Sequence, residues 1–424
     1  MIVVLGAGLA GLSAAFHLKN KNYRIFEREG EVGGLCRSVV QDGFTFDYTG
    51  HLLHSRHPYT QELLADLLPG ELNTHERRAA IYHDSGYIPY PFQANLWALE
   101  RSKIRECLLE FIESYCARTG TPENFLSWIY QAFGKGIAKY FMVPYNNKLW
   151  QVPLEEISLE WVERFVPCPN LEEVVDGALG GDLKAFGYNQ TFLYPMRGGI
   201  GVLPQAFLSK IHDVHLNKEA QSIDIEKKTV RFKDGQQVSY DTLISSLPLD
   251  ELLRSIICLP AEISAMKDHL RYVSVLNINL GVNRAHVSDY HWIYYPDPKY
   301  PFYRVGFPSN LSPHMVPEGA SAISVEISYL PSRPPAVEQM RDDTLSGLRT
   351  CGILRDDDRI VTEKMLRMKH AYVVYDSFRQ KHLSRLLTFL REHEIYPVGR
   401  YALWSYATME DAILQGKDVA ESLS

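Results

Sequence analysis

The chain contains little cysteine, and its cysteines form no recognisable pattern. Only six occur in 424 residues, and none belongs to a Cys-X-X-Cys pair. Neither a disulfide framework nor a cysteine-based zinc site is therefore predicted, and a reducing cytoplasmic setting is expected. The spacing of His51, His54 and His57 is compatible with a metal cluster, but no nearby carboxylate or cysteine completes a ligand set. We predict no metal.

Long apolar runs and basic blocks are also missing. No apolar stretch approaches the roughly 18 residues that a membrane-spanning helix needs, and the apolar first residues lack the basic flank of a signal peptide. The formal net charge is -7, and Lys and Arg form no cluster, which argues against nucleic acid or an anionic membrane as a partner. We expect a soluble protein with a small-molecule ligand and leave its oligomeric state open.

The clearest feature that is present is a glycine-rich turn between two short apolar runs. The run at 2–5 precedes the turn, and a helical stretch leads to a second run at 23–27. Strand, glycines, helix, strand and acid in this order predict a dinucleotide-binding βαβ unit. Its backbone approaches a pyrophosphate, and its acid binds ribose hydroxyls and disfavours NADP. The residues expected in these roles are Gly6, Gly8, Gly11 and Glu27.

A second glycine pair follows directly. Gly33 and Gly34 supply backbone N–H groups, and Arg37 can reach the same pyrophosphate. Because this extension is typical of FAD-binding folds, we predict noncovalently bound FAD. Near the C-terminus, Gly399 and Arg400 lead to a helix starting at Met409, whose N-terminus would stabilise negative charge on a reduced flavin.

The rest of the chain divides by periodicity. Residues 101–185 are mainly helical, including one expected helical stretch at 154–166, and β-type runs between proline-rich turns fill 263–385. The predicted fold is α/β, with a Rossmann-type FAD-binding domain, a helical insertion domain and a mainly antiparallel β-sheet substrate domain. The expected boundaries are 1–80, 186–262 and 386–424 for the FAD-binding domain, 101–185 for the helical domain, and 81–100 and 263–385 for the substrate domain.

Five sequence blocks occur together and span nearly the whole chain. They are GFTFDYTGH at 43–51, IPYPFQ at 88–93, FMVPYNNKLW at 141–150, NQTFLYPMRGG at 189–199 and YPFYR at 300–304. In content and order they resemble the UDP-galactopyranose mutase family, particularly its eukaryotic branch, within the wider group of amine oxidase-like flavoproteins.

This resemblance implies an isomerase that interconverts the pyranose and furanose forms of a nucleotide sugar, by default UDP-galactopyranose and UDP-galactofuranose. N5 of the reduced FAD would attack the anomeric carbon without net redox change. The reductant implied is NADPH, NADH or a separate reductase.

Carried over position by position, the resemblance places Arg304, Tyr372 and Tyr406 at the diphosphate and His51 beside the flavin. An arginine suits a diphosphate because its fork meets two oxygens at once. The remaining matches enclose the uridine or close over the substrate, and they are Tyr90, Phe92, Gln93, Phe141, Asn146, Trp150, Asn189 and Tyr294.

Two positions depart from the family pattern. Phe165 stands where eukaryotic members carry a diphosphate-contacting arginine, with Arg164 one position earlier, and Leu311 stands in place of a tyrosine. These changes leave room for another substrate, such as UDP-arabinopyranose, UDP-N-acetylgalactosamine or a non-uridine nucleotide sugar.

Two other functional classes share the cofactor fold. One is an oxidoreductase of the amine oxidase or protoporphyrinogen oxidase kind, which transfers hydride to the flavin. The other is a flavin-binding protein that acts through interaction rather than turnover.

Overall fold

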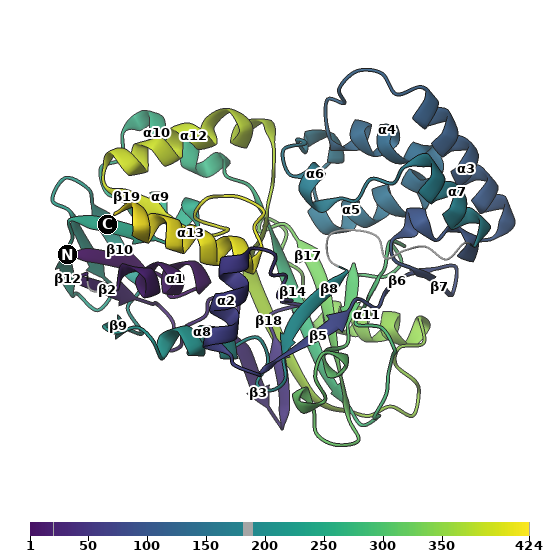
Figure 1. The fold of residues 1–424 in the computed structure, drawn as a ribbon, viewed down its shortest axis with the longest axis horizontal. Coiled ribbons are helices and arrows are strands. Elements are labelled where there is room, and N and C mark those ends of the chain that lie inside the picture. The colour runs from purple at the N-terminus through teal and green to yellow at the C-terminus, as the bar shows by residue number, and fades with distance from the viewer. Residues whose placement is uncertain (20, 181–189, 424) are drawn as a thin grey trace.

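The computed structural model describes residues 1–19, 21–180 and 190–423, and its N-terminal residues form the centre of a five-stranded parallel sheet (Figure 1). The strand order is β19 (Ile395–Pro397), β13 (Thr242–Ser245), β1 (Ile2–Leu5), β2 (Tyr23–Phe26) and β9 (Val214–His215). Every neighbouring pair is parallel. Val3 and Val4 of β1 are fully buried, which explains the uninterrupted apolar run.

Helix α1 (Leu9–Leu18) follows β1 and packs closely against the C-terminal helix α13 (Met409–Ser422). Small residues permit this approach: a Cβ on Gly416 would lie 2.4 Å from the carbonyl oxygen of Ala10. Figure 1 shows α13 alongside α1, with α2 near the N-terminal end of α13. The remaining helices of this region are α2 (Pro58–Leu67), α8 (Val202–Leu208), α9 (Leu249–Ser255), α10 (Ala261–Met266) and α12 (Ser377–Glu392).

A seven-stranded sheet forms the second layer of the molecule. In spatial order it contains β18 (Ile360–Val373), β14 (Tyr272–Val282), β17 (Ser321–Tyr329), β16 (Arg304–Gly306), β15 (Trp292–Tyr294), β6 (Ala79–His83) and β7 (Gly86–Pro89). All neighbours are antiparallel except β15 and β6. One face packs against α11 (Val337–Thr350) in an apolar cluster that includes Ile278 and Leu348, so the other face is left for the cavity described below.

Smaller sheets and short helical turns connect these layers. The hairpin β3 (Ser38–Gln41)/β4 (Phe44–Asp47), the pair β5 (Leu72–Glu76)/β8 (Thr191–Pro195) and the meander β10 (Ala220–Asp224), β11 (Thr229–Phe232) and β12 (Gln237–Ser239) are all antiparallel. The 3₁₀ turns are η1 (Phe92–Ala94), η2 (Leu96–Ala98), η4 (Leu154–Glu156), η5 (Lys267–His269), η6 (Pro308–Asn310) and η7 (Pro313–Met315).

The helical region contains α3 (Arg101–Cys116), α4 (Phe125–Ile137), a π-helical segment η3 (Ala138–Met142), α5 (Val143–Trp150), α6 (Val162–Phe165) and α7 (Leu171–Leu179). The expected helical stretch at 154–166 is wrong: η4 and the four-residue α6 replace it. The backbone between them bonds elsewhere, because the Ser158 N–H donates to the Tyr375 carbonyl (2.6 Å) and the Ile157 carbonyl accepts from Phe125 N–H (2.8 Å). These tertiary bonds take the place of helical partners.

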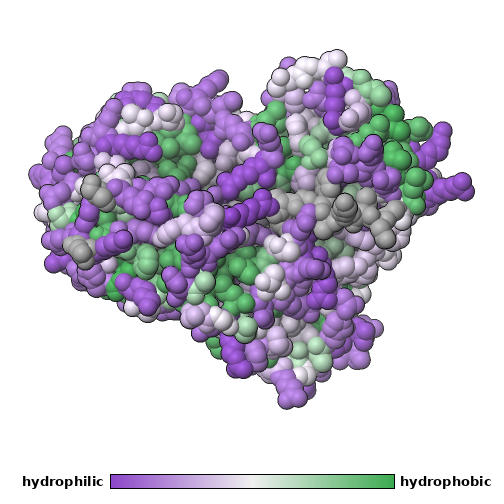
Figure 2. All heavy atoms as spheres, in the orientation of Figure 1, coloured by the Kyte–Doolittle hydropathy of each residue, from purple (hydrophilic) through white to green (hydrophobic). Residues whose placement is uncertain are grey.

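The predicted fold class is confirmed: a parallel sheet with covering helices, a helical region and a mainly antiparallel sheet are all present. The domain boundaries stay a prediction. Figure 2 shows hydrophilic side chains over most of the visible face, with apolar groups gathered near the outer edge of the helical region. Among the described residues, no helix combines the length and apolar character required to cross a bilayer.

Candidate functional site

A cavity of about 1110 Å³ extends from the glycine turn after β1 to the strands β15, β16 and β18. Its walls come from both large sheets, from the helical region and from the start of α13. Typical small-molecule pockets measure roughly 300–1,000 Å³, so this cavity is large enough for an extended dinucleotide with part of a second ligand.

Two glycine turns face each other at one end of the cavity. Gly6 has a φ of +90°, and the N–H of Gly33 donates to the Ala7 carbonyl (2.8 Å). Helix α1 begins after Gly8 without a side-chain cap, which leaves its first N–H groups for an anion. Gly34 approaches so closely that a Cβ on it would lie 3.3 Å from the Cα of Gly8. This turn therefore fits a pyrophosphate.

Glu27 lies just after β2, buried and held in one orientation. Its carboxylate accepts hydrogen bonds from the N–H groups of Ala7 (2.7 Å) and Glu29 (3.0 Å). Arg37 is also fixed: its Nε donates to the Gly34 carbonyl (2.8 Å), and its guanidinium lies 5.1 Å from the ring centre of Tyr48. The adenosine and diphosphate parts of FAD fit this arrangement of acid, glycines and arginine.

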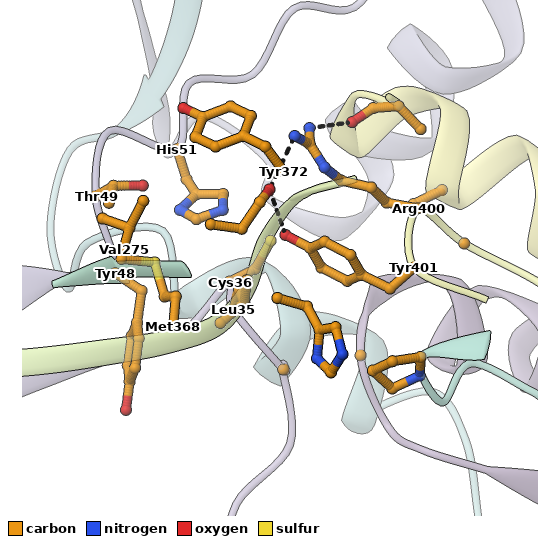
Figure 3. Close-up of a pocket in the computed structure, with 18 of the residues that line it drawn as sticks. Leu35, Cys36, Tyr48, Thr49, His51, Val275, Met368, Tyr372, Arg400 and Tyr401 are labelled. Carbon is orange, nitrogen blue, oxygen red and sulfur yellow. Dashed lines mark hydrogen bonds between the residues drawn. The ribbon is translucent and has the colours of Figure 1, made fainter. Parts of the chain in front are cut away.

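The flavin end of the cavity centres on Arg400 (Figure 3). Its guanidinium donates to the carbonyls of Ala407 (3.0 Å) and Ala371 (3.1 Å) and lies 4.2 Å from the ring centre of Tyr406. Within the described part of the chain no carboxylate pairs with Arg400, and its buried Nε makes no hydrogen bond. A buried cation without a counter-ion favours an anionic ligand group at this place.

His51 points into the same space, as Figure 3 shows. Burial and the nearby charge of Arg400 lower the pKa of His51 to about 4. The imidazole is therefore neutral near pH 7, and its Nδ1 is buried without a hydrogen-bond partner among the described residues. It can accept or donate a single hydrogen bond to a ligand, according to its tautomer.

The neighbouring part of the cavity wall combines a second arginine with tyrosines. Arg304 forms a two-pronged ion pair with Glu326 across β16 and β17, at 2.9 Å and 2.8 Å. Its Nη1 makes no hydrogen bond within the described residues. The Tyr303 hydroxyl also donates to Glu326 (2.5 Å). Burial raises the pKa of Tyr372, whose ring is stacked with that of Tyr406 at 6.0 Å, so Tyr372 remains a protonated donor.

Aromatic and amide side chains continue the wall beyond Arg304. The rings of Tyr90 and Tyr294 lie 5.2 Å apart. The amide nitrogen of Asn146 donates to the Met142 carbonyl (2.7 Å), and that of Gln93 donates to the Pro167 carbonyl (3.0 Å). The backbone thus orients both amides, and aromatic faces beside such groups suit a planar base.

Most of the predicted site residues line this one cavity. They are Gly6, Gly8, Glu27, Gly33, Gly34, Arg37, His51, Tyr90, Gln93, Phe141, Asn146, Tyr294, Arg304, Tyr372, Gly399, Arg400, Tyr406 and Met409. Their individual roles stay predictions. Asn189 lies outside the described residues.

Three predicted residues do not line the cavity. A Cβ on Gly11 would lie 2.0 Å from the Gly6 carbonyl oxygen, so Gly11 serves close packing of the turn. Phe92 is fully buried behind Phe141, with ring centres 5.3 Å apart. Trp150 is fully buried behind Trp161, at 5.1 Å. Phe92 and Trp150 support the wall rather than form it.

The two departures from the family pattern have different positions. Phe165 lies on the cavity wall, with its ring 4.4 Å from that of Tyr406. Arg164 instead donates to both carboxylate oxygens of Asp411, at 2.7 Å and 2.9 Å, and its side chain is 57% exposed. Phe165 and not Arg164 therefore faces the cavity, and the match of Phe165 to the family's arginine position stays a prediction. Leu311 packs in the core and is not among the lining residues.

Sequence reasoning missed several residues of the site. Tyr48, Tyr145, Trp161, Tyr303 and Tyr401 line the cavity, and Glu326 holds Arg304. Tyr48, Tyr145 and Tyr303 lie inside the sequence blocks at 43–51, 141–150 and 300–304, so membership of these blocks could have indicated them. No sequence signal indicates Glu326, because its pairing with Arg304 is set by the register of β16 and β17. Within the described residues, no group of three or more His, Cys, Asp or Glu side chains is placed to hold a metal ion.

A family model described as flavin containing amine oxidoreductase matches residues 9–424. The chain belongs to this family. The match begins just after the first glycine turn and includes Gly33 and Gly34, most of the cavity walls and the C-terminal helix. Together with the geometry above, it supports FAD as the cofactor.

Individual proteins that are similar to this chain differ in activity. A crystal structure of reduced UDP-galactopyranose mutase is 33% identical, with a TM-score of 0.94 over 100% of this chain and 95% of that one. Protoporphyrinogen oxidase 2 of Arabidopsis thaliana is 24% identical over 59% of this chain and 48% of its own length, so the chain spans about half of that protein. UDP-galactopyranose mutase of Mycoplasma genitalium is 22% identical over 45% of this chain and 50% of its own length.

Proposed function

We propose that this protein is an FAD-dependent nucleotide-sugar mutase that interconverts pyranose and furanose forms, with UDP-galactopyranose and UDP-galactofuranose as the default pair. The main support is that one cavity joins the FAD cradle to a cluster of an arginine and tyrosines that suits a diphosphate. The similarity to a reduced UDP-galactopyranose mutase over the whole chain adds to this.

When bound and reduced, FAD would supply the nucleophile for the sugar's anomeric carbon. The protein's residues then have to stabilise the departing diphosphate. Arg304, the protonated hydroxyl of Tyr372 and the hydroxyl of Tyr406 are the donors proposed for its oxygens. The pairing with Glu326 fixes the guanidinium plane before the ligand arrives, so less orientational freedom is lost on binding.

Arg400 has a different part in this proposal. It lies at the flavin end, close to the first turn of α13, whose N-terminal residues Thr408 and Met409 also line the cavity. The cation and the helix N-terminus together would stabilise negative charge on the bound cofactor. His51, neutral near pH 7, lies where it can bond to that cofactor without adding charge.

The sugar and nucleotide are less closely defined. Phe165 places an aromatic ring beside Tyr406 at the position where a second cation would face the diphosphate. A nucleotide sugar other than UDP-galactose therefore belongs within the proposal. NADPH or NADH is the proposed reductant.

One further class has support of its own. The similarity to a protoporphyrinogen oxidase favours an oxidoreductase that transfers hydride to FAD. The two classes differ in one respect that can be measured: an oxidoreductase reduces its flavin with substrate, whereas a mutase turns over without net redox change.

The deciding experiment incubates the holoprotein, reduced anaerobically with dithionite, with UDP-galactopyranose or UDP-galactofuranose and resolves the isomers by chromatography. Conversion by the reduced protein and not by the oxidised control is expected. If neither isomer, nor any of the other nucleotide sugars named above, is converted, the mutase proposal fails. Flavin reduction by an added amine or porphyrinogen would instead support the oxidoreductase.

A further inference from the structure

A single carboxylate joins two walls of the cavity that are distant in sequence. Glu410 lies in the first turn of α13, and its Oε1 accepts hydrogen bonds from the N–H groups of Arg56 (2.8 Å) and His57 (2.9 Å). The hydroxyls of Thr60 (2.7 Å) and Ser55 (3.3 Å) also donate to it. The two N–H groups lie just before α2, so Glu410 satisfies donors at the start of another helix.

The chain that Glu410 holds is the continuation of the loop that carries His51. Gly50, His51, Leu52 and His54 of this loop line the cavity. On the other side, Thr408, Met409 and Ala412 around Glu410 line it as well. Glu410 itself is not a lining residue, and it therefore acts on the cavity only through these neighbours.

The same loop is also fixed at other points. At its start, Asp47 accepts hydrogen bonds from the hydroxyls of Ser38 (2.6 Å) and Tyr194 (2.5 Å). In its middle, Leu53 exchanges two backbone hydrogen bonds with Leu193, at 3.0 Å and 2.8 Å. Between them Thr49 has a φ of +67°, and a Cβ on Gly50 would meet nothing within 4 Å. Gly50 thus has free space around it, whereas the N–H of Thr49 donates to the Asn277 side chain (3.4 Å), so the anchors of the loop decide where this segment lies.

We infer that Glu410 is a positioning residue that ties the His51 loop to the helix facing the flavin. Oε1 of Glu410 accepts hydrogen bonds from the chain that continues the His51 loop, and Glu410 itself belongs to α13. A shift of either wall of the cavity therefore moves the other. Donors from Ser55, His57 and Thr60 converge on the same Glu410 oxygen, which suits a single residue to this task. The inference requires bound FAD but not the identity of the substrate, so it is independent of the proposed mutase activity.

The test compares Glu410→Ala with Glu410→Gln in the FAD-loaded protein. The readouts are the NMR signals of ¹⁵N-labelled His51, assigned with His51→Asn, and the quenching of flavin fluorescence by iodide. We expect Glu410→Ala to shift or broaden the His51 signals and to raise the quenching constant roughly threefold or more, since the loop opens more often. Glu410→Gln, which keeps an acceptor oxygen, should restore most of the wild-type behaviour.

Glu421→Ala is the matched control, because Glu421 lies on the same helix and pairs only with Lys417 in the described structure. It should leave both readouts unchanged. Wild-type signals and quenching in Glu410→Ala at equal flavin content would overturn the inference, as would a Glu410→Gln variant as perturbed as Glu410→Ala. If Glu410→Ala does not fold, the double variant Ser55→Ala/Thr60→Val decides: a smaller change in the same direction is expected, and no change overturns the inference.

Discussion

At the scale of single residues, the cavity is defined by how its charges are compensated. The side chain of Arg304 is 21% exposed and that of Glu326 only 3%, so the ion pair is set into the sheet with the arginine toward the cavity. Arg400 has carbonyl oxygens and aromatic rings around it instead of a carboxylate. The cavity therefore contains one arginine that is neutralised by a carboxylate and, nearby, one that is not.

This difference affects how Arg304 should be tested. Arg304→Ala would leave Glu326 as a buried, unpaired carboxylate, which costs roughly 3–5 kcal/mol of folding stability. Arg304→Lys keeps the positive charge but loses the planar guanidinium group that can bond to two oxygens at once. We expect Arg304→Lys to retain wild-type flavin content and to weaken UDP binding about tenfold or more, measured by titration of flavin fluorescence. Unchanged UDP affinity would remove Arg304 from the site.

Phe165 allows a prediction in the opposite direction. An arginine at this position would add a cation beside Tyr406 on the cavity wall. Phe165→Arg should therefore tighten binding of UDP about tenfold, because charge-assisted hydrogen bonds to phosphate are strong. Arg164→Ala is the control and should have no such effect, since Arg164 is held by Asp411 away from the cavity. Weaker binding by Phe165→Arg would show that the ring itself contacts the ligand.

His51 gives a prediction about pH. Its pKa falls from 6.5 to about 4 on folding, so between these values the unfolded chain binds more protons than the folded protein. The contribution of His51 to the free energy of unfolding is fully present above pH 6.5. It is lost as the pH falls toward 4, by at most roughly 3 kcal/mol. Denaturant unfolding at several pH values should show that His51→Asn loses less stability than the wild type over this range.

Asp47 provides a control of opposite sign. Burial raises its pKa from 3.8 to about 6, so its contribution is present below 3.8 and lost as the pH rises through 6. Asp47→Asn should therefore abolish the decrease in folding stability that Asp47 causes as the pH rises from 3.8 to about 6. Equal pH profiles for the wild type and His51→Asn would contradict the account of His51.

At the scale of elements, α1 and α13 determine where the cofactor can lie. Both begin at the cavity, and they cross at small residues: the Ser13 hydroxyl donates to the Ile413 carbonyl (2.6 Å) beside Gly416. A capping box made by Thr408 and Asp411 fixes the start of α13. The contacts between α1 and α13 lie one or two turns from the cavity. They determine where the N-terminal residues of both helices lie relative to the cofactor.

Gly416→Ala tests this arrangement. Its Cβ would lie 2.4 Å from the Ala10 carbonyl oxygen and 2.7 Å from the Ala14 nitrogen, so the helices must separate. We expect a loss of roughly 1–3 kcal/mol of stability and a lower flavin-to-protein absorbance ratio. Gly86→Ala, whose Cβ would lie 3.6 Å from the nearest atom, should change neither. A Gly416→Ala variant with normal flavin content would show that α13 tolerates displacement.

At the scale of the whole molecule, the cavity is the place where the two sheets meet. Residues that line it come from the glycine turns, the 48–54 loop, the helical region, β18 and α13. A ligand that fills it contacts elements from the first residues to the last and links their stability.

Hydrogen exchange with and without FAD should reveal this linkage. We expect FAD to slow exchange in the first turn of α1, in the 48–54 loop and at 367–372 of β18. Helix α3, whose residues do not line the cavity, should serve as an internal reference. Protection confined to the glycine turn would mean that the two sheets are not coupled through the cofactor.

The sequence determined the parts of this protein that depend on near neighbours. Gly6, Gly8 and Glu27 could be recognised because a short strand, a tight turn and a helix impose their spacing locally. The fold class followed from apolar periodicity for the same reason. Tertiary structure alone decided that Glu326 pairs with Arg304, through the register of β16 and β17, and that Phe92 and Trp150 support the wall from behind. It also decided that Glu410 meets a loop some 350 positions earlier. Such contacts depend on packing between segments far apart in the chain, and no local pattern encodes them.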